Sequence, residues 1–330
     1  MLAVPFVPAT RPPRAPFVPV ALWCAILAAL LTGCGGEATR STAPAGDFGT
    51  TPFAGAEDPM APGALGEARA LHARYRYPLA VGNHWDYVIR SRVVTIPDVG
   101  DPSTVLARTP WSAEVLGTVT AGTHEYFQVG EGDPRSAAPL VPVYLQRQDA
   151  EGFYELDPPL TPAGVRAGPG TGPLAAAIDL AAIDRSLDGS AHHAAFARAA
   201  QRVAAKLERM RRSLGDVPAA TDGAEPNELT FLRYPLQLGS RWTVRESPFF
   251  GRIVAGLDEL TLPVGRVRAW RIRGVSELYG PNDRVHFWYG RAGLVRIHLR
   301  AEMDAVDDTG AVIGRVVAEY DQSLVRFTTH

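Results

Sequence analysis

The sequence predicts a mainly β protein of the β-rich α+β class. It would contain two tandem antiparallel β subdomains related by an internal repeat, with a helical insertion between them. An eleven-residue motif at 77–87 recurs at 234–244. Apolar and polar residues alternate with period two after each copy, which is typical of strands with one buried face. The stretch between the copies is Ala-rich and has helical periodicity.

The first 33 residues are expected to be a targeting segment rather than part of the fold. Arg11 and Arg14 supply positive charge, and no acidic residue occurs before Glu37. An apolar run follows at 17–31. It is shorter than the roughly 20 residues that span a bilayer as a helix, so we expect a cleaved signal rather than a membrane-spanning helix.

The run Leu-Thr-Gly-Cys at 31–34 resembles the lipobox of bacterial lipoproteins. The resemblance implies cleavage between Gly33 and Cys34 and lipidation of the Cys34 thiol, so that Cys34 begins the mature protein. Gly35 behind the cysteine, in place of Asp, implies a lipid anchor on the periplasmic face of the outer membrane rather than on the inner membrane. The alternative is an ordinary secretory signal with a chance cysteine.

Composition limits the structure and the partners of the mature chain. The second cysteine, Cys24, lies in the expected signal, so no disulfide is expected. Without residues 1–33 the chain has 31 basic and 35 acidic residues, a net charge of −4. This balance gives no electrostatic footprint for nucleic acid. The expected partners are the membrane, through the lipid anchor, and an envelope protein or an apolar ligand.

Composition and periodicity also divide the chain into segments. A tether rich in Gly, Ala and Pro is expected at 34–70, because it has few large apolar residues to bury. The full division is a signal at 1–33, the tether at 34–70, a first β subdomain at 71–157, a Pro/Gly linker with a helical insertion at 158–226, and a second β subdomain at 227–330.

The repeated motif has a structural interpretation. Proline ends an incoming helix, glycine permits a turn with positive φ, and tryptophan then opens a strand and anchors it in the core. The alternative is that Trp85 and Trp242 stack on a ligand. The motif residues and their counterparts are Tyr77, Pro78, Leu79, Gly82 and Trp85, and Tyr234, Pro235, Leu236, Gly239 and Trp242.

Helices are expected at 175–187 and 191–214, where Phe196, Val203, Leu207, Met210 and Leu214 form one apolar stripe of the second helix. The other faces of that helix are basic. They fit either a helix packed across a sheet or a helix that touches anionic lipid. After the second motif, strands are expected at 241–246, 251–254, 259–262, 266–277, 284–289, 294–301 and 312–327.

No motif indicates a catalytic site, a metal site or a cofactor. Asp308-Thr309-Gly310 resembles the active-site loop of retroviral-type aspartic proteases, but a hairpin turn explains it as well, and no second copy occurs. The histidines lack ligand spacing: His192 and His193 are adjacent, and His286 and His298 fall on neighbouring expected strands. We therefore expect no enzyme activity.

The pattern Tyr-Pro-Leu-x-x-Gly-x-x-Trp-x-Tyr, with a later Gly-Leu-Val-Arg at 293–296, resembles a family of uncharacterised secreted bacterial lipoproteins over about residues 75–300. The resemblance implies an extracytoplasmic β-rich domain and no known activity. The second copy departs from the pattern at Val244.

Three functions remain open: a non-enzymatic interaction or scaffold module of the envelope, a carrier or chaperone for lipid or another apolar ligand, and an envelope hydrolase. A carrier would have a cavity in its curved sheet. The candidate lining residues are Trp270, Phe287, Trp288 and Tyr289.

Overall fold

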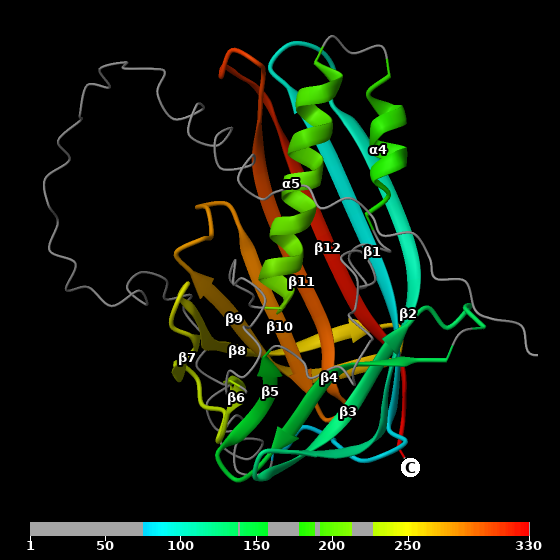
Figure 1. Cartoon of the computed structure of the whole chain (residues 1–330), viewed down its shortest axis with the longest axis vertical. Coiled ribbons are helices and arrows are strands. Elements are labelled where there is room, and N and C mark those ends of the chain that lie inside the picture. Colours follow the sequence, from blue (N-terminus) through cyan, green and yellow to red (C-terminus); the bar gives the residue numbers. More distant parts are fainter. Residues whose placement is uncertain (1–74, 138, 158–177, 189–191, 213–226, 330) are drawn as a thin grey trace, which may run out of the picture. The chain divides into compact units, whose positions relative to one another are not determined.

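The computed structural model describes residues 75–137, 139–157, 178–188, 192–212 and 227–329 (Figure 1). The predicted signal, tether, Cys34 and linker at 158–173 lie outside these residues. The strands are β1 (His84–Pro97), β2 (Ser103–Ala121), β3 (His124–Gly132), β4 (Val141–Gln148), β5 (Gly152–Asp157), β6 (Asn227–Arg233), β7 (Arg241–Arg245), β8 (Phe250–Leu262), β9 (Gly265–Ser276), β10 (Arg284–Gly290), β11 (Gly293–Val306) and β12 (Val312–Thr328). The helices are α4 (Leu180–Ser186) and α5 (His193–Arg212). The predicted mainly β fold class is confirmed.

These strands form one antiparallel sheet in the order β6-β5-β4-β3-β2-β1-β12-β11-β10-β9-β8-β7. Each half of this order is a meander of six consecutive strands. The halves join through β1 and β12, whose ladder runs from the pair His84/Thr328 to the pair Pro97/Gly314. The two halves that carry the repeated motif therefore share one sheet.

The sheet curls until its edge strands, β6 and β7, approach each other; we call their meeting line the seam. The Trp242 indole N–H on β7 donates to the carbonyl oxygen of Thr230 on β6 at 2.9 Å. Arg252 on β8 donates through Nη1 to the carbonyl oxygen of Phe231 at 2.9 Å. Side chains thus satisfy two carbonyl groups of an edge strand, which protects the edge from pairing with another chain.

The repeated motif forms the same turn in both copies. The Gly82 N–H donates to the carbonyl oxygen of Val115 on β2, and the Gly239 N–H donates to that of Val254 on β8. The two glycines have φ of 87° and 78°. In β2 and in β8, a β-bulge follows immediately beyond that partner. The halves are therefore equivalent strand by strand, with β1 matching β7 and β2 matching β8.

Two strand assignments differ from the sequence expectation. β6 was expected to open the second β subdomain, but it pairs with β5 and completes the first meander. The second half of the sheet therefore begins at the motif, at 234. The separate strands expected at 251–254 and 259–262 are one strand, β8, because the β-bulge between them lets the ladder with β9 continue.

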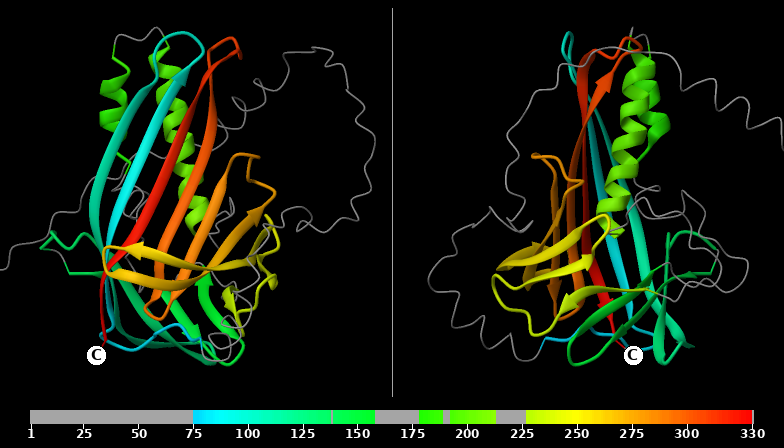
Figure 2. Two further views of the ribbon diagram at one scale, coloured as in Figure 1. Left: turned by 180° about the vertical axis from the view of Figure 1, so that it is seen from behind. Right: turned by 60° about the vertical axis from the view of Figure 1, so that its left-hand side comes forward.

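α5 packs across the inner face of the sheet beside β11 and β12, with α4 next to it (Figures 1 and 2). The predicted apolar stripe is buried, since Phe196, Val203, Leu207 and Met210 are at most 2% exposed. α4 begins at Leu180, where the Asp179 carboxylate accepts the Ala182 N–H and caps the helix. Positions 175–177 of the expected helix lie outside the described residues.

Leu214, the last residue of the expected stripe, lies outside the described residues. The helix thus matches the interpretation of one packed on a sheet. Within the described residues, no helix is long and apolar enough to cross a membrane.

We predict that Gly82→Ala and Gly239→Ala each lower the free energy of unfolding by about 1–2 kcal/mol, because an L side chain is strained at positive φ. Urea denaturation followed by tryptophan fluorescence measures the loss. Val81→Ala is the control, since this side chain is 51% exposed, and its effect is expected to stay within about 0.5 kcal/mol. A clearly smaller loss in one copy would contradict the equivalence of the two turns.

Candidate functional site

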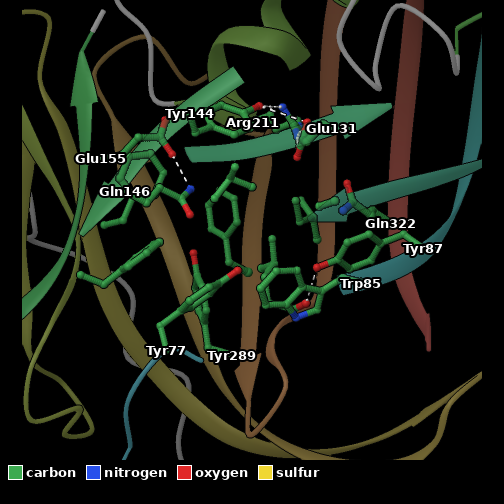
Figure 3. A pocket seen from close by; sticks show the side chains of 17 residues that line it. Tyr77, Trp85, Tyr87, Glu131, Tyr144, Gln146, Glu155, Arg211, Tyr289 and Gln322 are labelled. Carbon is green, nitrogen blue, oxygen red and sulfur yellow. Dashed lines mark hydrogen bonds and ion pairs between the residues drawn. The ribbon is translucent and has the colours of Figure 1, made fainter. Parts of the chain in front are cut away.

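The inner face of the curled sheet contains a cavity of about 80 Å³ near the C-terminal end of α5 (Figure 3). Its walls combine aromatic rings with charged and amide side chains. Arg211 and Glu131 lie on the side near α5, and Tyr77 and Tyr289 lie opposite them. The lining residues are Tyr77, Trp85, Tyr87, Ala113, Val129, Glu131, Tyr144, Gln146, Phe153, Glu155, Arg211, Phe231, Phe287, Tyr289, Leu294, Ile297 and Gln322.

A buried ion pair joins α5 to the sheet at this cavity. Arg211 Nη2 lies 3.0 Å from both carboxylate oxygens of Glu131 on β3, and Nη1 donates to the Tyr144 hydroxyl at 2.9 Å. The side chains of Arg211 and Glu131 are 7% and 10% exposed. A cation in the last turn of a helix also interacts favourably with the helix dipole. The pair fixes the end of α5 against β3 and β4.

Several other polar groups of the cavity also have hydrogen-bond partners. The Gln146 amide donates to Glu155 Oε2 at 3.0 Å, and the Tyr320 hydroxyl donates to Gln322 Oε1 at 2.6 Å. The Tyr87 hydroxyl donates to a backbone carbonyl oxygen at 2.9 Å. Burial raises the pKa of Tyr87 well above its usual value, so this phenol stays protonated and acts as a donor. The cavity is therefore polar, and many of its polar groups bond to one another, although the buried Arg211 Nε has no partner in the part of the chain that the structure describes.

The structure separates the four aromatic residues predicted to line a cavity. Phe287 and Tyr289 point inward from β10 and line it. Trp270 lies on β9, directly opposite Tyr289 of β10. It faces inward and is buried, but it is not among the lining residues. Trp288 points to the opposite face, where its indole N–H donates to Asp258 at 2.8 Å. The expectation is wrong for Trp288, because neighbouring residues of a strand face opposite sides of a sheet.

The two motif copies meet at the cavity but contribute unequally to it. Tyr77 and Trp85 line it, whereas Tyr234 and Trp242 do not. The Tyr77 ring stacks on Phe153 with centroids 4.3 Å apart, and the Tyr77 N–H donates to the Tyr234 hydroxyl at 3.0 Å. Trp85 and Trp242 are 2% and 5% exposed. Both tryptophans thus serve mainly as core anchors.

Sequence reasoning missed the polar residues of the cavity. Glu131, Gln146 and Glu155 occupy inward positions of short strands, where a polar residue resembles an ordinary solvated one. Arg211 lies among several basic residues of α5, which together indicate a solvent-facing surface. One signal was available: Arg211 follows Leu207 by four positions and therefore shares its buried face.

The hairpin at 307–310 has the structure of a turn. Asp307 Oδ1 accepts the N–H groups of Thr309 and Ala311. The side chain of Asp308 is 94% exposed and pairs with Arg198 of α5 at 3.0 Å. This geometry fits the hairpin interpretation of Asp-Thr-Gly.

The histidines are similarly dispersed. His286 and His298 face each other across β10 and β11 on the outer face, and His84 lies between Asp86 and Glu114. Among the residues that the structure describes, no group of three His, Cys, Asp or Glu side chains could hold a metal ion.

The sequence matches no protein-family profile and no curated protein. Several solved structures are similar in part to this chain. A predicted lipoprotein from Parabacteroides distasonis has 11% identity and a TM-score of 0.27, covering 76% of this chain and 97% of that one. A predicted exported protein with a YmcC-like fold from Bacteroides fragilis has 11% identity and a TM-score of 0.29, covering 77% and 98%. Lipovitellin has 10% identity and a TM-score of 0.23, covering 76% of this chain and 26% of that one.

We predict that Arg211→Met lowers the free energy of unfolding by about 3–5 kcal/mol, because it leaves Glu131 buried without its cation. The double variant with Glu131→Gln is expected to regain most of the lost free energy of unfolding, because no buried charge is then left unpaired. A double-mutant cycle measured by urea denaturation tests this. Arg202→Met, at an exposed position of the same helix, is the control. Additive losses from the two single changes would show that the pair does not stabilise the fold as a unit.

Proposed function

We propose that this chain is a lipid-anchored protein of the bacterial cell envelope whose curled sheet serves as a non-enzymatic interaction module. The anchor is proposed at Cys34, on the residues that resemble a lipobox. The observation that supports an interaction role is the filled interior. The inner face of the sheet packs against α5 and its own aromatic residues. It leaves a cavity of about 80 Å³ at the Arg211 end of the helix and an open, partly polar pocket of about 180 Å³ beside Lys206 and Met210.

The size and chemistry of this cavity argue against a carrier of a large apolar ligand. A dry apolar cavity of about 150 Å³ holds one benzene molecule, so about 80 Å³ does not accommodate an acyl chain. The wall also carries the ion pair between Arg211 and Glu131. An apolar ligand would bury these charged groups further without pairing with them, which costs free energy. A larger partner is therefore expected to bind on the outside.

Two features of the cavity bear on the other two functions, the carrier and the hydrolase. Phe287 and Tyr289 line the cavity, as a carrier requires. Glu131 and Glu155 both line it as well, and a hydrolase would need such a pair of carboxyl groups. However, Glu131 is held by Arg211, and Glu155 accepts a hydrogen bond from Gln146. These partners match a structural role of the two carboxylates.

Native mass spectrometry of a chain that starts at residue 35 tests the interaction role against the carrier. The described strands, helices and core all lie within 75–329, so this chain retains them. Purified gently from cells, it is expected to show the mass of the polypeptide alone. A discrete additional mass in the lipid range, lost on denaturation, would contradict the proposal and favour a carrier.

We predict that Cys34→Ala moves the full-length protein from the membrane fraction to the soluble fraction or leaves it as an unprocessed precursor, because the thiol that takes the lipid is gone. Cell fractionation and mass spectrometry of the N-terminal peptide measure this. Cys24→Ala is the matched control and is expected to leave both processing and location unchanged. Membrane association and processing of Cys34→Ala like those of the unmodified protein would disprove the anchor.

A further inference from the structure

The outer face of the sheet, opposite α5, carries rows of arginine side chains. Arg90 and Arg92 point outward from β1, and Arg108 points outward from β2; all three are exposed. Arg90 and Arg108 are direct cross-strand partners. Like charges placed opposite each other in a sheet are destabilising. Among the described residues, no carboxylate lies within salt-bridge distance of either Arg90 or Arg108.

The rows continue across the other half of the sheet. In register, the row of Arg90 passes through Asp321 on β12, His298 on β11 and His286 on β10 to Arg273 on β9. The row of Arg92 passes through Glu319 to Arg300 and Arg284, a second pair of directly opposed arginines. Arginines far apart in the sequence therefore gather on one face.

Positive charge exceeds negative charge on this arginine face. With Arg271 and Arg296 at its border, the face contains eight arginines, namely Arg90, Arg92, Arg108, Arg271, Arg273, Arg284, Arg296 and Arg300. The nearby carboxylates are Asp258, Asp321, Glu302 and Glu319. Asp86, which binds Arg326, and Asp304, which lies opposite Arg315, add carboxylates and arginines in equal number. Arginines therefore outnumber carboxylates on this face, although the whole chain has a net charge of −2.

The positive potential of the face also acts on His286. Burial and the neighbouring Arg271 lower the pKa of His286 from its ordinary value to about 4, with His298, Arg273 and Arg284 adding to the effect. His286 therefore stays neutral near pH 7, and the arginines supply the charge of the face at physiological pH.

Apolar surface lies beside these arginines. A groove of about 700 Å³ opens next to Arg108 and is also lined by Val88, Pro110, Val325 and Arg326. Val325 is 40% exposed, and Leu106, opposite Arg92, is 71% exposed. Seen from behind, neither of the described helices lies in front of the upper part of this face, and the β8–β9 hairpin crosses its lower part (Figure 2, left).

We propose that the arginine face docks on an anionic phospholipid surface, with guanidinium groups on lipid phosphates and the adjoining apolar side chains against the lipid. Guanidinium groups match phosphate oxygens in bidentate geometry. Cations beside exposed apolar groups suit a lipid surface better than a soluble acidic chain, which offers no apolar contact. The proposal rests on the proposed lipid anchor in one respect: a tether at 34–70 would keep the face near the membrane and raise its effective concentration there.

Vesicle co-sedimentation of the chain that starts at residue 35 tests this docking. The probes are phosphatidylcholine vesicles with and without phosphatidylglycerol, at low and high salt. Binding is expected only with the anionic lipid and is expected to weaken as salt rises. Arg90→Gln with Arg108→Gln is expected to reduce the partition coefficient roughly 30-fold, since each arginine near an anionic surface contributes about fivefold.

Arg185→Gln with Arg202→Gln is the matched control. It removes the same charge from exposed positions of α4 and α5, on the other side of the sheet, and is expected to keep most of the binding. Unchanged thermal unfolding of both variants shows that they fold.

Equal binding to neutral vesicles, or equal loss in both variants, would overturn the proposal. A third outcome would also overturn it: the protein binds the acidic polysaccharide alginate but not vesicles, and the Arg90/Arg108 variant loses the alginate binding. The face would then bind a polyanionic chain rather than a membrane. This chain lacks Cys34, so none of these outcomes depends on lipidation, which fractionation of Cys34→Ala tests separately.

Discussion

The pairing of β1 with β12 is the constraint on which the rest of the structure depends. It joins the first and last described strands over a ladder from His84/Thr328 to Pro97/Gly314. A six-strand meander alone would leave two edges and an inner face without cover. Joined at this ladder and curled toward the seam, the two meanders share a core with α5. The cost of ordering such distant segments is offset by one large buried interior rather than two small ones.

The interior is polar at its centre, and this decides what it can hold. Arg211 enters from the helix and meets Glu131 and Tyr144 from β3 and β4. A buried ion pair stabilises a fold little compared with apolar residues of the same size. Removing only one of its two partners is costly, because the other charge stays buried without a counter-charge. It therefore acts as a constraint on where α5 ends. A ligand in this small space would have to satisfy those polar groups, which few apolar molecules can do.

Local features of this fold could be predicted from the sequence, and long-range ones could not. Two such local features are the motif turns at Gly82 and Gly239 and the buried stripe of α5. Each can be recognised from residues a few positions apart in the sequence. By contrast, the pairing of β6 with β5 spans the helical insertion, and its residues fit either half equally well. The polar cavity was missed for a similar reason: Glu131 and Arg211 make sense inside only as partners, and they lie 80 residues apart.

The two halves of the sheet share their turns and bulges but differ in the side chains on their outer faces. Both halves keep the same motif turn and bulge, because these set the curl of the sheet. On the outer face of the first half, Tyr126, Leu145 and Leu156 form a separate apolar cluster. Outward arginines lie on β9, β10 and β11 of the second half and continue onto β1 and β2 of the first half, so only the far part of the first half has the apolar cluster. Outward side chains contribute little to the shared core, so they are free to diverge between the halves. Where like charges lie opposite each other on such a surface, binding a partner of opposite charge relieves their repulsion.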